Sequence, residues 1–234
     1  MTVKFCTLPQ KPVDPKLVKA HSILERACDS AEAFFNAFVT VRKTRGAHGT
    51  PTDHEQDLLR AALVFAAAGL DSMVKQLVRD ALPTVLSNDT GAHAQFAGYV
   101  QSRLKRGDPI DLRFLAEAIA SDRPSQYMRE QLVSELTGSS LQSKDQLLRV
   151  ATYFAIKANE IAGDLNKLKD TFDTRNQIAH EMDIQLGQPN RGRRQRTIRK
   201  MRQSTSVIFA TAVEFYLAVE KRLQEPTEEH ACAT

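Results

Sequence analysis

The chain has 234 residues, of which 42% are hydrophobic and 26% charged, and its net charge at pH 7 is +4. This length is enough for one large domain or two small ones with an ample core. Trp is absent and aromatic residues make up only 6%, which argues against a protein that stacks single-stranded bases on an aromatic surface. Helix-favouring residues are abundant and runs of β-branched residues are scarce, so we expect an all-α fold.

The cysteines and the apolar segments favour a cytoplasmic protein. Cys6, Cys28 and Cys232 are odd in number and widely spaced, so they form neither a disulfide framework nor a metal-binding knuckle. The first residues lack the apolar core of a signal peptide. The longest apolar run, from Ala61 to Leu70, is about half as long as a membrane span. We therefore expect free thiols, no cofactor and no membrane association.

The chain is expected to start with an extended or loosely ordered segment over residues 1–13. Asp14 and Pro15 follow, and this pair is typical of a helix cap with proline in the first turn. Apolar residues then recur at helical spacing as far as Gly46. The pattern predicts a first helix of about thirty residues.

A second long helix should begin at the capping box formed by Thr52 and Glu55 and run to Pro83. Its centre, residues 60–75, is apolar almost all round, which is typical of a helix buried on most sides. Four charged residues of this helix fall along one stripe, within about 100° of arc: Arg60, Asp71, Lys75 and Arg79.

The middle of the chain, residues 88–138, is more polar and is interrupted by Gly and Pro. These interruptions predict three shorter helices, over about 92–106, 110–121 and 125–137. The polarity of this segment indicates a helical insertion or a peripheral cap on the main bundle.

The C-terminal part of the chain predicts three further helices. One begins at Ser143 and runs to about Ile161, and the next is capped by Asp164. After a loop over residues 187–194, a final helix covers about 197–224. We treat the whole chain, residues 1–234, as a single domain.

The helix that follows Asp164 carries the most informative motif, Arg175-Asn176-Gln177-Ile178-Ala179-His180. Asn176 and His180 are four positions apart and share a helix face, on which Asp173 also lies. Arg175 and His180 are five apart, about 140° around the axis, so we expect them to flank a groove without necessarily touching. Asp173 is a candidate supporting residue.

These side chains are suited to cleaving RNA without a metal. An imidazole moves protons near neutral pH, and a guanidinium grips a phosphate with two hydrogen bonds. His180 would take the proton of a ribose 2′-hydroxyl or give one to the leaving 5′-oxygen, while Arg175 stabilises the charge that grows on the phosphate. Asn176 would orient the imidazole or the phosphate. The products would be a 2′,3′-cyclic phosphate and a 5′-hydroxyl, and DNA would be spared.

A basic run follows the motif, with seven basic residues and no acid in twelve positions. Without these charges the rest of the chain has a net charge of −3, so the positive charge is concentrated here. Such a patch is typical of a protein that binds a polyanion, and we expect it to contact RNA; the alternative is a solvated loop and helix start. The residues are Arg191, Arg193, Arg194, Arg196, Arg199, Lys200 and Arg202.

Two segments of the chain resemble HEPN domains (higher eukaryotes and prokaryotes nucleotide-binding). The motif from Arg175 to His180 matches the Arg-x4–6-His signature of that family, and the stretch from Leu58 to Val74 is similar to an early helix of RiboL-PSP-type members. The resemblance implies an all-α bundle that dimerises around the Arg-x4-His helix. It implies a metal-independent endoribonuclease that acts as a toxin or antiviral, abortive-infection effector, with an antitoxin or defence partner. It marks Arg175, Asn176 and His180, and gives no counterpart for residues 88–138.

Other interpretations remain open at this stage. The chain could be a catalytically inactive RNA- or nucleotide-binding module that regulates a partner, or a purely structural helical protein. Asp71 and Lys75, four positions apart, predict a surface ion pair, while Asp71 is also a candidate supporting residue of the active centre. His48 and His54 lie in one loop but have no third ligand at a suitable spacing, so no metal site is expected.

Overall fold

The computed structural model describes residues 4–5, 7–106, 109–185, 187, 189 and 192–224, with the backbone alone at 106 and 109–111. Within these residues the regular elements are ten α-helices, with no β-strand. The expectation of an all-α fold is therefore confirmed for the described part of the chain.

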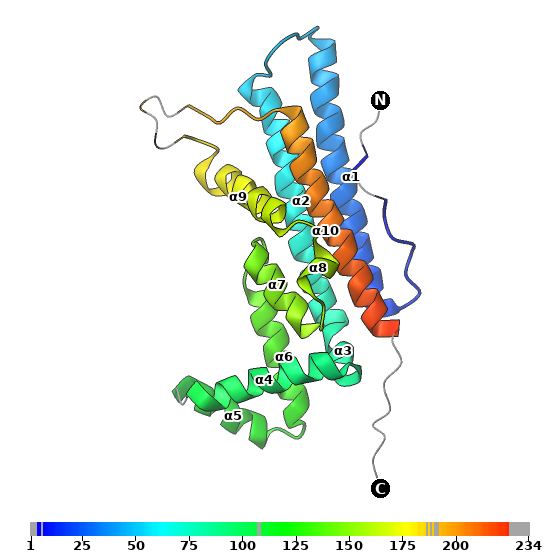
Figure 1. Ribbon diagram of the computed structural model, residues 1–234, viewed down its shortest axis with the longest axis vertical. Helices are drawn as coiled ribbons and strands as arrows, with labels where there is room; N and C mark the ends of the chain where they lie inside the picture. Colours follow the sequence, from blue (N-terminus) through cyan, green and yellow to red (C-terminus); the bar gives the residue numbers. More distant parts are fainter. Residues whose placement is uncertain are drawn as a thin grey trace.

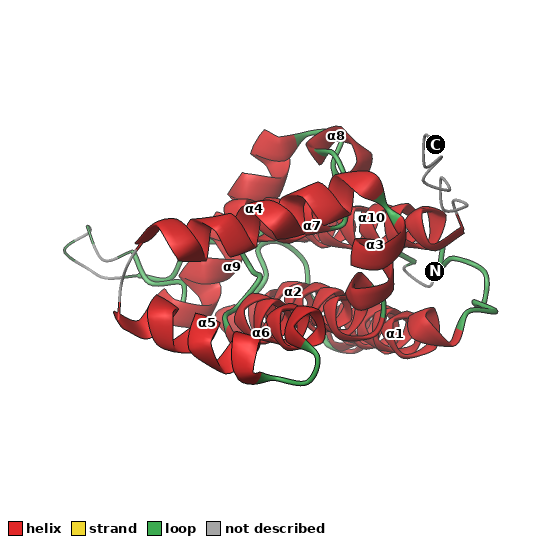
Figure 2. Ribbon diagram, turned by 90° about the horizontal axis from the view of Figure 1, so that it is seen from below, coloured by secondary structure: helices red, strands yellow, loops and turns green. Residues whose placement is uncertain are grey.

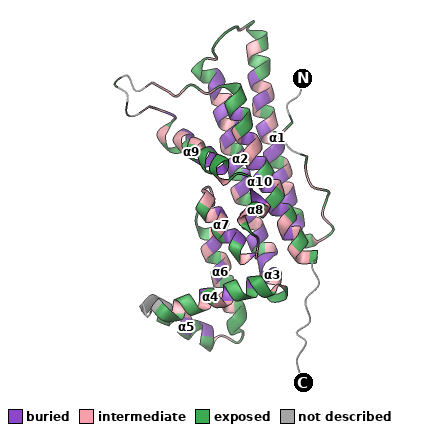
Figure 3. Ribbon diagram, viewed as in Figure 1, coloured by how far each residue is buried: buried purple, intermediate pink, exposed green. Residues whose placement is uncertain are grey.

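Three long helices lie side by side along the longest dimension of the molecule (Figure 1): α1 (Pro15–Thr44), α2 (Asp53–Asp80) and α10 (Ile198–Gln224). Helices α1 and α2 form an antiparallel pair, and their facing apolar residues form the centre of the core. Gly69 makes this close pairing possible, because a Cβ at that position would come within 2.2 Å of the Ala27 Cβ. Figure 3 shows the buried residues concentrated where these helices face one another.

The predicted starts of the first two helices are confirmed by their caps. The Asp14 carboxylate accepts a hydrogen bond of 2.8 Å from the Lys16 backbone N–H, with Pro15 in the first turn. At the start of α2, the Thr52 hydroxyl accepts from the Glu55 N–H, and the Glu55 carboxylate accepts from the Thr52 N–H at 2.8 Å. Both caps satisfy amides that have no partner within the helix.

The extended start of the chain is better fixed than the sequence indicated. The Phe5 N–H donates to the Glu32 carboxylate at 3.0 Å. The Phe5 ring meets Phe35 of α1 edge-on, with ring centroids 4.8 Å apart. The described residues before Val13 therefore pack along α1 without forming a helix.

Helix α2 ends three residues before the predicted proline. A short helix, α3 (Leu82–Asn88), follows it with Pro83 in its first turn. Pro83 was expected to end the helical region, and this prediction was wrong because proline fits the first turn of a new helix. Helix α2 is long and apolar enough to cross a membrane, but 56% of its most apolar window is buried in the bundle, as in the core helix of a globular protein.

The polar middle of the chain forms α4 (Thr90–Arg106), α5 (Pro109–Ala120) and α6 (Pro124–Gly138), close to the three helices predicted there. These helices lie at one end of the long ones, where α4 runs across their direction (Figures 1 and 2). Helix α4 packs on α3, and α6 packs on α2. The segment thus lies beside the main bundle and contacts α2 directly.

The helix predicted from Ser143 to Ile161 is broken in the structure into α7 (Lys144–Tyr153) and α8 (Ala158–Ile161). The chain turns at Ala155, which has a left-handed φ of 55°. In a continuous helix, Phe154 and Ile156 would lie about 200° apart, yet both are buried. The break allows both side chains to enter the core, so the prediction of one continuous helix was wrong.

Candidate active site on helix α9

Helix α9 (Leu165–Glu181) carries the motif and crosses the long helices beside α2 and α10 (Figure 1). Its start is the predicted one, since the Asp164 carboxylate accepts hydrogen bonds of 3.0 Å from two backbone amides of the first turn. The helix ends where Met182 adopts a left-handed conformation. Leu168, Phe172 and Ile178 are buried and fix the rotation of the helix against the core.

Arg175, Asn176 and His180 come together at the C-terminal half of α9. The Arg175 Nη1 donates a hydrogen bond of 3.0 Å to Asn176 Oδ1 and lies 3.4 Å from His180 Nε2. The sequence predicted two residues that flank a groove, whereas the Arg175 side chain curls along the helix and reaches the imidazole directly. Because a guanidinium can only donate, this contact is a hydrogen bond in the His180 tautomer whose Nε2 accepts.

The Arg175 guanidinium is partly buried and keeps most of its hydrogen-bonding capacity. Its Nε is buried without a hydrogen-bond partner in the described part of the chain. Burial lowers the pKa of Arg175, and the nearby negative charge of Asp71 partly offsets this effect. No carboxylate among the described residues forms an ion pair with Arg175, so its charge remains available to an anion.

Asp71 lies near Arg175, but its carboxylate accepts hydrogen bonds from other groups. Its Oδ2 accepts from Lys75 Nζ at 3.0 Å, and its Oδ1 accepts from the Leu141 backbone N–H at 2.6 Å. The predicted pair of Asp71 with Lys75 is therefore present. The two side chains are 14% and 18% exposed, so the pair is partly buried. Asp71 influences Arg175 through its charge alone.

Asp173 shares the face of His180, as expected, and is exposed. Its carboxylate accepts a hydrogen bond of 3.1 Å from Lys169 Nζ. No described contact joins it to Arg175 or His180. In this arrangement Asp173 belongs to a solvated ion pair on the same helix.

A buried ion cluster, which the sequence did not reveal, holds the chain just after α9. Asp183 is fully buried and accepts from Arg60 Nε at 2.8 Å and from Arg196 Nε at 2.9 Å. Arg196 also donates to the Gln177 side chain of α9 at 2.9 Å. This cluster ties the end of α9 to α2 and so fixes the helix that carries His180. The available signal was Arg60 itself, because an arginine in an apolar helix needs a buried carboxylate partner.

The basic run divides into two parts in the structure. Arg193 pairs with Asp57 at 2.7 Å, Arg194 pairs with Glu181 at 3.1 Å, and Arg196 belongs to the Asp183 cluster. By contrast, three residues of the run on α10 are exposed and have no carboxylate partner among the described residues: Arg199, Lys200 and Arg202. Arg191, also predicted to contact RNA, lies outside the described residues. The sequence did not predict these ion pairs, because the run itself contains no acidic residue and the carboxylates come from other segments.

The described residues contain no group of three His, Cys, Asp or Glu side chains that could hold a metal ion. Cys28 is buried and lies 3.6 Å from the Glu32 carboxylate, while Cys6 and Cys232 fall outside the described residues.

Comparison with known proteins gives no further guidance. No protein-family model, no curated protein and no solved structure matches this chain.

Proposed function

We propose that this protein is a metal-independent endoribonuclease of the HEPN type that cleaves RNA by attack of the ribose 2′-hydroxyl on the adjacent phosphate. The observation that supports the proposal most strongly is the direct contact of Arg175 with His180 at an exposed position of α9. A cation and a proton-transfer group lie within reach of one phosphodiester, as this reaction requires.

The contact also implies an order of events. In the free protein, the Arg175 Nη1 lies 3.4 Å from the Nε2 of His180. An RNA phosphate is a stronger acceptor for a guanidinium than a neutral imidazole is, so it would draw Arg175 away. The freed Nε2 then takes the 2′-hydroxyl proton, while Arg175 stabilises the charge on the phosphate oxygens.

A second copy of the chain would complete the site. Transesterification needs a base for the 2′-hydroxyl and an acid for the leaving 5′-oxygen, and each chain offers one His180. Twofold dimers are the commonest oligomers, and two α9 helices across such an axis would supply both groups. Met182, next to the site and 64% exposed, is an apolar side chain that this contact would cover.

The experiment is incubation of purified protein with end-labelled RNA and a DNA of the same sequence, in EDTA. The proposal predicts that RNA is cut to 2′,3′-cyclic phosphate and 5′-hydroxyl ends while DNA stays intact. His180→Ala should slow cleavage by at least about 10²–10⁴, the usual share of a general acid or base. His93→Ala, at an exposed histidine of α4, is the matched control and should cleave normally.

An inactive RNA- or nucleotide-binding module is the second candidate function. It is favoured by one observation, the contact of Arg175 with the Nε2 of His180, which would persist if no phosphate displaced Arg175. RNA binding without cleavage, in both the wild type and His180→Ala, would select this candidate. Growth arrest on expression that Arg175→Ala relieves would instead support a toxin or defence effector.

A further inference from the structure

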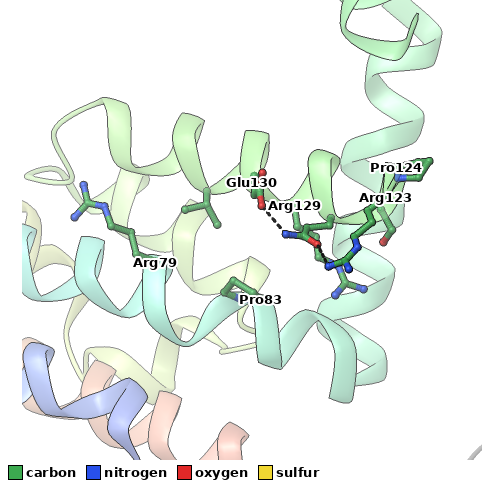
Figure 4. A pocket seen from close by; sticks show the side chains of 9 residues that line it. Arg79, Pro83, Arg123, Pro124, Arg129 and Glu130 are labelled. Atoms are coloured by element: carbon green, nitrogen blue, oxygen red, sulfur yellow. Dashed lines mark hydrogen bonds between the residues drawn. The ribbon is translucent and has the colours of Figure 1, made fainter. Parts of the chain in front are cut away.

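A cavity separate from the motif lies between the end of α2, the start of α3 and the first half of α6 (Figure 4). Its volume of about 750 Å³ is that of a typical small-molecule site, which holds about 300–1,000 Å³. Arg79 is eight residues beyond Asp71 on α2, about 12 Å along the helix axis. The cavity therefore does not belong to the Arg175 and His180 site.

The cavity is lined by three arginines and one carboxylate, Glu130. Arg123 and Arg129 gather at one end of it and Arg79 lies at the other, with Pro83 between them (Figure 4). None of these arginines forms an ion pair with a carboxylate of the described residues. The cavity therefore keeps an excess of positive charge, which Glu130 offsets only in part.

The end with two arginines has donors that face no acceptor. Arg129 donates to the Ser87 hydroxyl at 2.6 Å, and its guanidinium carbon lies 5.8 Å from the centre of the Phe96 ring. Its Nε is buried and lacks a hydrogen-bond partner in the described part of the chain. Arg123 donates only a long bond of 3.4 Å to Gln126, and Gln126 in turn donates to Glu130 at 2.9 Å. Arg129 is thus held in place and Arg123 is exposed, and both keep donors that no described residue accepts.

The same end of the cavity contains the N-terminus of α6. Arg123 is the N-cap residue and makes no capping hydrogen bond with its side chain, and Pro124 follows it in the first turn. Helix N-termini attract anions through unpaired backbone amides and the helix dipole. Here this effect acts together with two guanidinium groups, which can bind a phosphate through paired hydrogen bonds.

The middle of the cavity is apolar, with Pro83 on one side and Val133 on the other. We infer that this cavity binds a small molecule with a phosphate group at one end and an apolar ring at the other, as in a nucleotide. The phosphate lies at Arg123, Arg129 and the start of α6. The ring lies over Pro83 and Val133, and Arg79 closes the far end. This inference is independent of the proposed ribonuclease activity.

The test is isothermal titration of the full-length protein with three probes: ATP, adenosine and inorganic tripolyphosphate. ATP should bind, and adenosine should bind at least about tenfold more weakly because it lacks the charge that the arginines recognise. Tripolyphosphate should also bind more weakly than ATP, because it leaves the apolar middle of the cavity empty. Adenosine binding as tightly as ATP, or no ATP binding at all, would overturn the inference. Tripolyphosphate binding as tightly as ATP would overturn the assignment of an apolar ring.

Two variants test whether ATP binds in this cavity. Arg123→Gln, at an exposed side chain that the fold does not need, should weaken ATP binding by about tenfold. Arg113→Gln is the matched control, since Arg113 is 84% exposed on α5 and pairs only with Glu117; ATP affinity should not change. An equal loss in both variants would mean nonspecific attraction and would contradict the site. RNA cleavage by Arg123→Gln should equal that of the wild type, which separates failure of this inference from failure of the proposed function.

Discussion

Arg175 and the arginines of the 193–196 segment are both half-hidden cations beside the end of α9, yet they differ in what they face. Arg193, Arg194 and Arg196 each meet a carboxylate, and the strongest of these contacts is the buried Asp183 cluster. Arg175 faces an amide and an imidazole and forms no ion pair with a described carboxylate. The arginines of the 193–196 segment, which has no acidic residue in the sequence, are therefore neutralised by carboxylates in the fold to a greater extent than Arg175 is. Free positive charge has to be judged from the fold, because the acids that cancel it come from distant positions.

The largest effect on stability is expected from removing Asp183, the carboxylate at the centre of the buried cluster. Asp183→Ala would remove the fully buried carboxylate partner of Arg60, which is only 3% exposed, and leave it only the partly exposed Asp57 and Asp53. Removing one partner of a buried ion pair costs about 3–5 kcal/mol, so the free energy of unfolding in urea should fall by about this amount. Asp173→Ala is the control, because its pair with Lys169 is exposed and is worth about 0–1 kcal/mol. Equal losses in the two variants would show that the cluster does not hold the fold.

The exposed cations of α10 are expected to carry the RNA contact of the basic run. RNA binding is best measured against salt in the His180→Ala background, where cleavage does not interfere. Replacing Arg199, Lys200 and Arg202 together by Gln should reduce the slope of log K against log salt by about 2, at about 0.7 for each phosphate contact on a single strand.

The comparison is sharpened by replacing Arg193 and Arg194 by Gln in the same background. These two already face Asp57 and Glu181, so the salt slope should change little. If this double variant lowered the slope more than the triple variant did, the paired arginines would be the RNA contacts and the distinction between the two groups would fail.

The smallest expected effect is on the pH dependence of stability, through the carboxyl group of Asp57. Burial raises the pKa of this carboxyl, but hydrogen bonds from Arg193 and Arg60 outweigh it and hold the pKa below the ordinary value of 3.8. A carboxyl with a lowered pKa stabilises the fold above its unfolded value, and this stabilisation is lost as the pH falls through the folded value. Asp57→Asn should therefore be less stable than the wild type at pH 7, by no more than about 1 kcal/mol because the side chain is partly exposed. The difference should shrink well below pH 3.8; a difference that grows in acid would contradict this explanation.

The helices could be predicted wherever a local signal marks their ends. Asp14, Thr52 and Asp164 each begin a helix where the sequence places it, since a side-chain cap acts on amides two or three residues away. The break at Ala155 has no such signal. It arises because the side chains of Phe154 and Ile156 are both buried in the core, and this burial depends on tertiary packing that no local pattern indicates.

For the candidate site too, the features with a local signal could be predicted and those that depend on tertiary packing could not. The residue types and their spacing placed Arg175, Asn176 and His180 on neighbouring faces of one helix, but not the curl of Arg175 that brings it to the imidazole. The partnership of Arg60 with Asp183 spans 123 positions of sequence, and no local pattern links such residues. Long-range ion pairs of this kind decide which cations are free, and they are visible only in the fold.

The most direct test of the account is a double-mutant cycle on the rate of RNA cleavage, with Arg175→Ala, His180→Ala and both together. If the two side chains act on one phosphodiester, their effects are strongly non-additive, and the double variant should be only a few fold slower than the slower single variant. Rates that fall by the product of the two single effects, or that do not fall at all, would contradict a joint role for Arg175 and His180.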